Sequence, residues 1–67
     1  MVQRITEVVG ISKKSFADAA SNAIETASKT VRGIKWFRVS EMEGRCENGK
    51  VVEYHASLRI YFEYEGK

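Results

Sequence analysis

The stretch KVVEYHASLRIYFEY, residues 50–64, decides the fold, because apolar residues recur at every second position along it. Successive side chains of a β-strand point to opposite faces of the sheet, so this period of two predicts one long strand, Lys50–Tyr64. The apolar face predicts a sheet that is covered on one side only. That face carries Val52, Tyr54, Ala56, Leu58, Ile60, Phe62 and Tyr64, and the opposite face carries Val51, Glu53, His55, Ser57, Arg59, Tyr61 and Glu63.

The residues before this strand predict a β-hairpin. Cys46-Glu47-Asn48-Gly49 contains Asn-Gly, the dipeptide most favoured in tight hairpin turns. We therefore expect the preceding strand, Ile34–Arg45, to run antiparallel to Lys50–Tyr64. Simple alternation predicts Phe37 and Val39 on the covered face, and Trp36, Arg38, Ser40 and Met42 on the uncovered face.

Further upstream, Lys13–Arg32 reads as a helix that follows a short first strand, Gln3–Val9. Gly10-Ile11-Ser12 is expected to be a turn, with Ser12 as the N-cap and Gly33 as the C-terminal stop. The predicted fold class is α+β, with the order β-α-β-β and a three-stranded antiparallel sheet wrapped around one helix. The helix should pack through residues spaced three and four apart, namely Phe16, Ala20, Ala23, Ile24, Ala27 and Val31.

The length of the chain points to self-association. With 67 residues we expect one domain, 1–67, and a domain of this size buries only about 60% of its unfolded surface. Cys46 is the one cysteine and His55 the one histidine, so neither an intrachain disulfide nor a Cys/His zinc site within one chain is possible. Oligomerisation is the remaining way to stabilise so small a domain.

Charge and hydropathy exclude two classes of partner. A net charge of +2, from 11 basic and 9 acidic residues that are interspersed, is too balanced to indicate a nucleic-acid-binding protein. No apolar run approaches the ~20 residues of a membrane span, and the N-terminus lacks the pattern of a signal peptide. We expect a cytoplasmic protein without a membrane or nucleic-acid partner.

Trp36 is the residue that most needs an explanation. A tryptophan buries about 150–250 Å², and alternation places this one on the sheet face that the helix does not cover. Either a second subunit or a flat ligand should shield it, and the residues alone leave both open. His55 is expected on the same face, as a hydrogen-bond partner for a heteroaromatic edge or as an ordinary surface histidine.

No set of residues suggests catalysis, since no Ser/His/Asp or Cys/His arrangement is present. Carboxylates do gather around the hairpin, and they indicate either a solvated turn or a cation held between subunits. These carboxylates are Glu41, Glu43, Glu47 and Glu53.

The whole chain resembles the dodecin family in length, element order and motif placement. The residues that carry the resemblance are Val8-Val9-Gly10-Ile11-Ser12, Ala23-Ile24, Trp36-Phe37-Arg38-Val39 and Val52-Glu53-Tyr54-His55. The resemblance implies a hollow homododecamer in which flavins stack between symmetry-related tryptophans. Trp36 matches that tryptophan.

The same resemblance implies roles for three further residues. His55 stands where flavin-binding members commonly have a glutamine that bonds the flavin ring edge, and Glu41 matches an acidic position that contacts the ribityl chain in a haloarchaeal member. Many bacterial members have arginine at the position of Glu43, and here Arg45 is the expected substitute for binding a flavin phosphate. We expect a cofactor site made of Trp36, His55, Glu41 and Arg45, with no catalytic residue and no metal site.

The expected function is therefore the sequestration, storage and buffering of free flavin, whether FMN, riboflavin or FAD. A flavin-free dodecameric assembly protein that binds a cation such as calcium, or another small ligand, is the alternative. A flavoenzyme is not expected, because stacking on both faces of the flavin leaves no room for a substrate.

Overall fold

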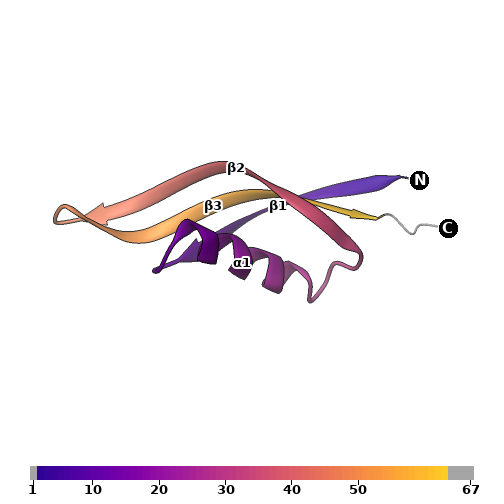
Figure 1. Ribbon diagram of the computed structural model, residues 1–67, viewed down its shortest axis with the longest axis horizontal. Helices are drawn as coiled ribbons and strands as arrows, with labels where there is room; N and C mark the ends of the chain where they lie inside the picture. Colours follow the sequence, from indigo (N-terminus) through magenta and orange to yellow (C-terminus); the bar gives the residue numbers. More distant parts are fainter. Residues whose placement is uncertain (1, 64–67) are drawn as a thin grey trace.

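The computed structural model describes residues 2–63 and has the predicted order β-α-β-β. Strand β1 spans Gln3–Ser12, helix α1 Phe16–Ala27, β2 Ile34–Glu47 and β3 Lys50–Glu63; Tyr64, the predicted end of β3, lies outside the described residues. The strands form one antiparallel sheet in the order β1-β3-β2, so the amphipathic strand is central. The molecule is 53 Å long, and the β2–β3 hairpin projects beyond α1 (Figure 1).

The core lies between the central strand and the helix. Helix α1 packs mainly on β1 and β3 and covers one face of the sheet (Figure 1). The period of two in β3 is confirmed, since Ala56, Leu58 and Ile60 are at most 1% exposed. The small side chains of the helix bring the two layers close together, and those that are buried are Ala19, Ala20, Ala23 and Ala27.

Gly10 lies inside β1, so the predicted turn at Gly10-Ile11-Ser12 is wrong. A Cβ atom at this position would lie 1.9 Å from the carbonyl oxygen of Ala19 and 2.9 Å from the Cβ of Ala23. The backbone of α1 therefore rests directly on this part of the strand. The glycine is required by the close approach of the helix and not by a change of chain direction.

Helix α1 begins three residues later than predicted, and its N-cap is Ser15 instead of Ser12. The Ser15 hydroxyl accepts a hydrogen bond from the Asp18 amide at 2.9 Å. Ser12 is the last residue of β1. Its hydroxyl donates to Asp18 Oδ2 at 2.7 Å and accepts from the Lys14 amide at 2.8 Å, so it joins the strand to the first helical turn.

The helix also ends earlier than predicted, at Ala27 instead of Arg32. The Ser28 hydroxyl donates to the Glu25 carbonyl at 2.7 Å, and such local bonds compete with the helical pattern. Thr30 and Val31 follow, and β-branched residues favour helix less. Gly33 has a φ of +73°, so it serves in the connection to β2 instead of directly after the helix.

The hairpin forms at the predicted turn. Asn48 and Gly49 have φ angles of +53° and +76°, the double left-handed geometry that Asn-Gly favours. β2 continues two residues beyond the predicted Arg45, to Glu47, which pairs with Lys50.

Three irregularities interrupt the β2–β3 register, and two of them change which side chains in the middle of β2 face the helix. Ser40 is an extra residue on β2 between the pairs Val39–Leu58 and Glu41–Ser57, and Val52 is an extra residue on β3 near the turn. Between these bulges the alternation is reversed relative to a regular hairpin. Met42 therefore lies opposite Ala56 on the helix side, and the prediction that it shares a face with Trp36 is wrong.

Candidate functional site

The sheet face that α1 does not cover, called the open face below, carries all four predicted site residues. On β3 its members are Glu53, His55, Ser57, Arg59 and Tyr61, because the residues between them are those packed towards the helix. Their cross-strand partners on β2 share the same face. The register pairs Trp36 with Tyr61, Glu41 with Ser57, Glu43 with His55, and Arg45 with Glu53.

Trp36 lies at one end of the open face with a large part of its surface uncovered. The side chain is 52% exposed, which confirms the prediction that its own helix does not bury it. Its ring stacks on Tyr61 with centroids 5.0 Å apart and an interplanar angle of 29°. Tyr61 thus covers one side of the indole, and the other side is a flat platform for a second planar group.

A pair of arginines occupies the next row beside Trp36. Arg38 lies directly opposite Arg59, and like charges in this position repel one another. Arg59 approaches Glu7 of β1 at 3.8 Å, whereas Arg38 has no ion pair within residues 2–63. An anionic group beside the indole would relieve this repulsion. The sequence contains the signal for this row, since each arginine lies two residues from an aromatic residue on the same face.

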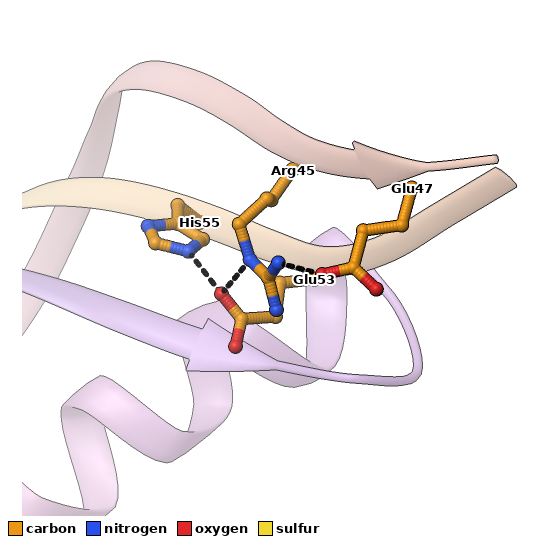
Figure 2. Close-up of polar contacts among 4 residues, drawn as sticks. All are labelled: Arg45, Glu47, Glu53 and His55. Atoms are coloured by element: carbon orange, nitrogen blue, oxygen red, sulfur yellow. Dashed lines mark hydrogen bonds and ion pairs between the residues drawn. The ribbon is translucent and has the colours of Figure 1, made fainter. Parts of the chain in front are cut away.

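At the other end of the open face, four side chains form the hairpin cluster, defined as Arg45, Glu47, Glu53 and His55 (Figure 2). Glu53 lies between two donors. Its Oε1 atom is 3.1 Å from His55 Nε2 and 3.2 Å from Arg45 Nε. Arg45 also pairs through Nη1 with Glu47.

These contacts set the charges of the hairpin cluster. The hydrogen bond from His55, followed by that from Arg45, lowers the pKa of Glu53, so this carboxyl is ionised at neutral pH. The hydrogen bonds to Glu53 and then to Glu47 raise the pKa of Arg45. The guanidinium of Arg45 is therefore already paired with two carboxylates, and any phosphate would compete with them.

Trp36 and His55 share the open face but do not meet within one chain. The partner of Trp36 is Tyr61, six residues along β3 from His55, a separation of about 20 Å at ~3.4 Å per residue. Glu41 lies between them, opposite Ser57. A small ligand that contacts both Trp36 and His55 must therefore lie between two chains.

A hollow of the subunit lies on the helix side. It is an apolar groove of about 610 Å³ between α1 and β2. The β2 side chains that line it, Phe37, Val39 and Met42, are 40–62% exposed. Apolar surface of this extent is typical of a contact with another protein chain.

Residues 2–63 show neither a metal-ion cluster nor a membrane-spanning helix. They contain no group of three or more His, Cys, Asp or Glu side chains arranged to hold a metal ion. Their one helix is too short and too polar to cross a membrane.

Comparisons with known proteins agree with the geometry. A model of the dodecin family matches residues 2–65. The dodecin of Thermus thermophilus is 34% identical over 64 residues, covering 96% of this chain and 93% of that protein. The structure of dodecin from Streptomyces coelicolor is similar with a TM-score of 0.94 and 36% identity, covering 98% of this chain and 94% of that one. Calcium dodecin from Mycobacterium tuberculosis, a calcium-chelating antigen, is similar with a TM-score of 0.83 and 26% identity, covering 100% of this chain and 96% of that one.

Proposed function

This chain belongs to the dodecin family of non-enzymatic binding proteins, and from that premise we propose that it binds free flavin between the subunits of a homododecamer. Its role is to sequester, store and buffer FMN, riboflavin or FAD. The observation that carries the proposal is the half-exposed indole of Trp36 on the open face.

The indole suits an isoalloxazine ring for physical reasons. The ring is flat and poorly soluble in water, and Trp36 offers one flat side because Tyr61 covers the other. Offset stacking of aromatic rings contributes about 0.5–1.5 kcal/mol beyond the burial of their area. A flavin stacked on both faces is shielded from reactants, so the site stores the ring instead of using it.

The surface that one chain leaves exposed supports assembly into an oligomer. Trp36 and His55 are about 20 Å apart, so a site that uses both is incomplete without a second copy. The apolar groove between α1 and β2 exposes side chains that a second chain would bury, and the open face exposes further apolar side chains. Those on β1 are Ile5, Val9 and Ile11.

The remaining site residues have assigned roles in the proposal. His55 bonds the edge of the ring, and Glu41 contacts the ribityl chain. Arg45 was the expected phosphate ligand, but its two carboxylate partners favour Arg38, next to Trp36, as the residue that meets a phosphate.

The test is a titration of FMN or riboflavin with purified protein, followed by flavin fluorescence. We expect strong quenching by the unaltered protein, weaker binding with Trp36→Phe, and loss of binding with Trp36→Ala. Phe37→Leu is the matched control, because it removes an aromatic ring from the opposite face of the same strand. Equal quenching by Trp36→Ala would overturn the proposal.

Calcium binding is the second candidate, and the similarity to a calcium-chelating dodecin supports it. Because residues 2–63 of one chain hold no metal cluster, such a site would need carboxylates from two chains. Equilibrium dialysis against calcium separates the candidates, as does the visible spectrum, since bound flavin makes the protein yellow.

A further inference from the structure

The contact between Glu53 and His55 determines which nitrogen of the imidazole carries the proton. An ionised carboxylate is only an acceptor of hydrogen bonds. Glu53 is ionised at neutral pH, and its Oε1 atom lies 3.1 Å from His55 Nε2. The proton must therefore be on Nε2, so that Nε2–H donates to Glu53 (Figure 2).

The other nitrogen, Nδ1, then becomes the group that is available to a ligand. A neutral imidazole has one donor and one acceptor, and Glu53 engages the donor. Nδ1 makes no hydrogen bond to residues 2–63 and carries a lone pair. His55 is partly exposed, with 31% of its side chain accessible, so a ligand on the open face can reach it.

We infer that Glu53 is a positioning residue that holds His55 as a hydrogen-bond acceptor, so that the site selects flat heteroaromatic rings with an N–H group on their edge. This inference rests on the proposed flavin function. Oxidised flavin meets the requirement, because its pyrimidine ring carries an N–H, N3–H, between two carbonyl groups. A glutamine side chain could both donate and accept, whereas His55 held by Glu53 can only accept.

Side chains from all three strands surround His55. Glu53 on β3 and Glu43 opposite on β2 are the carboxylates that face it, Arg45 reaches it through Glu53, and β1 places the apolar Ile11 opposite. A neutral imidazole accepts at Nδ1 when Nε2–H donates to Glu53, and this is the form that prefers an N–H edge.

The first experiment requires no flavin. His55 is the one histidine of the chain, so the ¹⁵N spectrum of the side chain is free of overlap. At pH 8 we expect Nε2 to be protonated and Nδ1 to be bare in the unaltered protein. Glu53→Gln should shift the population towards the other tautomer, because an amide can donate as well as accept. A proton on Nδ1 in the unaltered protein, or an unchanged spectrum in Glu53→Gln, would overturn the inference.

Glu47→Gln is the matched control. It removes a carboxylate of the same hairpin cluster that contacts Arg45 but not His55. The inference requires that this variant leave the tautomer unchanged. An equal effect of Glu47→Gln and Glu53→Gln would show that the charge of the cluster, and not the hydrogen bond from His55, fixes the proton.

The second experiment compares riboflavin with N3-methylriboflavin by fluorescence quenching. At pH 8 we expect the methylated ligand to bind about tenfold more weakly, which corresponds to one lost hydrogen bond. The ratio of the two dissociation constants should fall towards one in Glu53→Gln, but not in Glu47→Gln. In His55→Gln the ratio should persist, because the amide oxygen of glutamine can still accept from N3–H.

The outcomes separate the two proposals. Tight and equal binding of both ligands at pH 8 would refute the role of Glu53 while leaving flavin binding intact. Absence of riboflavin binding would refute the proposed function and with it the ligand selection, while the ¹⁵N spectrum would still show whether Glu53 holds the proton on Nε2.

Discussion

Substitution of Gly10 by alanine should destabilise the subunit strongly, because it forces α1 away from β1. The added Cβ would lie 1.9 Å from the Ala19 carbonyl oxygen and 2.9 Å from the Ala23 Cβ. Neither atom is at the end of a flexible side chain, so the whole helix has to move. Overpacking of this kind costs about 3 kcal/mol or more.

A smaller effect acts in the opposite direction. Alanine reduces the conformational entropy of the unfolded chain, which raises the free energy of unfolding by at most about 1 kcal/mol. The expected net loss in the free energy of unfolding is therefore about 2 kcal/mol. In a chain of 67 residues this lowers the melting temperature by roughly 10 °C.

The assay is urea unfolding followed by circular dichroism at one fixed protein concentration, since assembly contributes to apparent stability. Gly44→Ala is the matched control. The Cβ it adds to β2 meets the Glu53 carbonyl oxygen at 3.3 Å and Val51 Cγ1 at 3.7 Å, and should change stability by less than about 1 kcal/mol. If Gly10→Ala were as mild as this control, close contact between helix and strand would not be the reason for the glycine.

Four further predictions concern single residues. Leu58→Ala removes a side chain that is 1% exposed and should cost about 2–5 kcal/mol in urea unfolding; a loss under about 1 kcal/mol would contradict its place in the core. Ser15→Ala removes the helix N-cap and should cost about 1 kcal/mol in the same assay, whereas Ser21→Ala, at an exposed helix position, should be nearly neutral. Arg38→Gln should weaken FMN binding about threefold to tenfold and leave riboflavin binding unchanged, so equal effects on both ligands would argue against a phosphate contact. Because the folded-state pKa of Glu53 is lowered, its ionised form contributes stability above the ordinary value of 4.5 and loses it as the pH falls through the folded-state pKa. Unfolding of the unaltered protein and Glu53→Gln should therefore differ at neutral pH and converge in acid, and a difference that persisted in acid would have another origin.

The fold was predictable where a periodic pattern was long enough. The alternation in β3 predicted this strand, the side chains it buries and its hairpin partner, whereas its central place in the sheet is seen only in the structure. Gly10 was misread because a glycine in a strand and a glycine in a turn look the same in sequence, and only the position of α1 separates them. The length of α1 was overestimated because Ser28, Thr30 and Val31 form local bonds that spacing alone does not reveal.

The candidate site was predictable for Trp36 but not for its surroundings. Counting back from the turn without bulges puts Met42 on the open face, opposite His55, whereas the structure places Glu43 there. The two bulges add one residue to each strand, so their effects cancel before Trp36 and its face is predicted correctly. The contact between Glu53 and His55 was accessible, since residues two apart on a strand share a face, but its consequence for the proton required the distance.

The extra residue at Ser40 affects how strongly the β2–β3 ribbon bends, but not which residues pair across it. A bulge increases the local twist, and here the Ser40 hydroxyl donates to the Ser57 carbonyl at 3.2 Å. Deletion of Ser40 would bring Val39 and Glu41 together while every existing cross-strand partner stayed the same. The ribbon would become straighter, yet the arginine row, the indole and the hairpin cluster would keep their neighbours. Curvature can therefore be tuned one residue at a time, by indels that spare the binding chemistry.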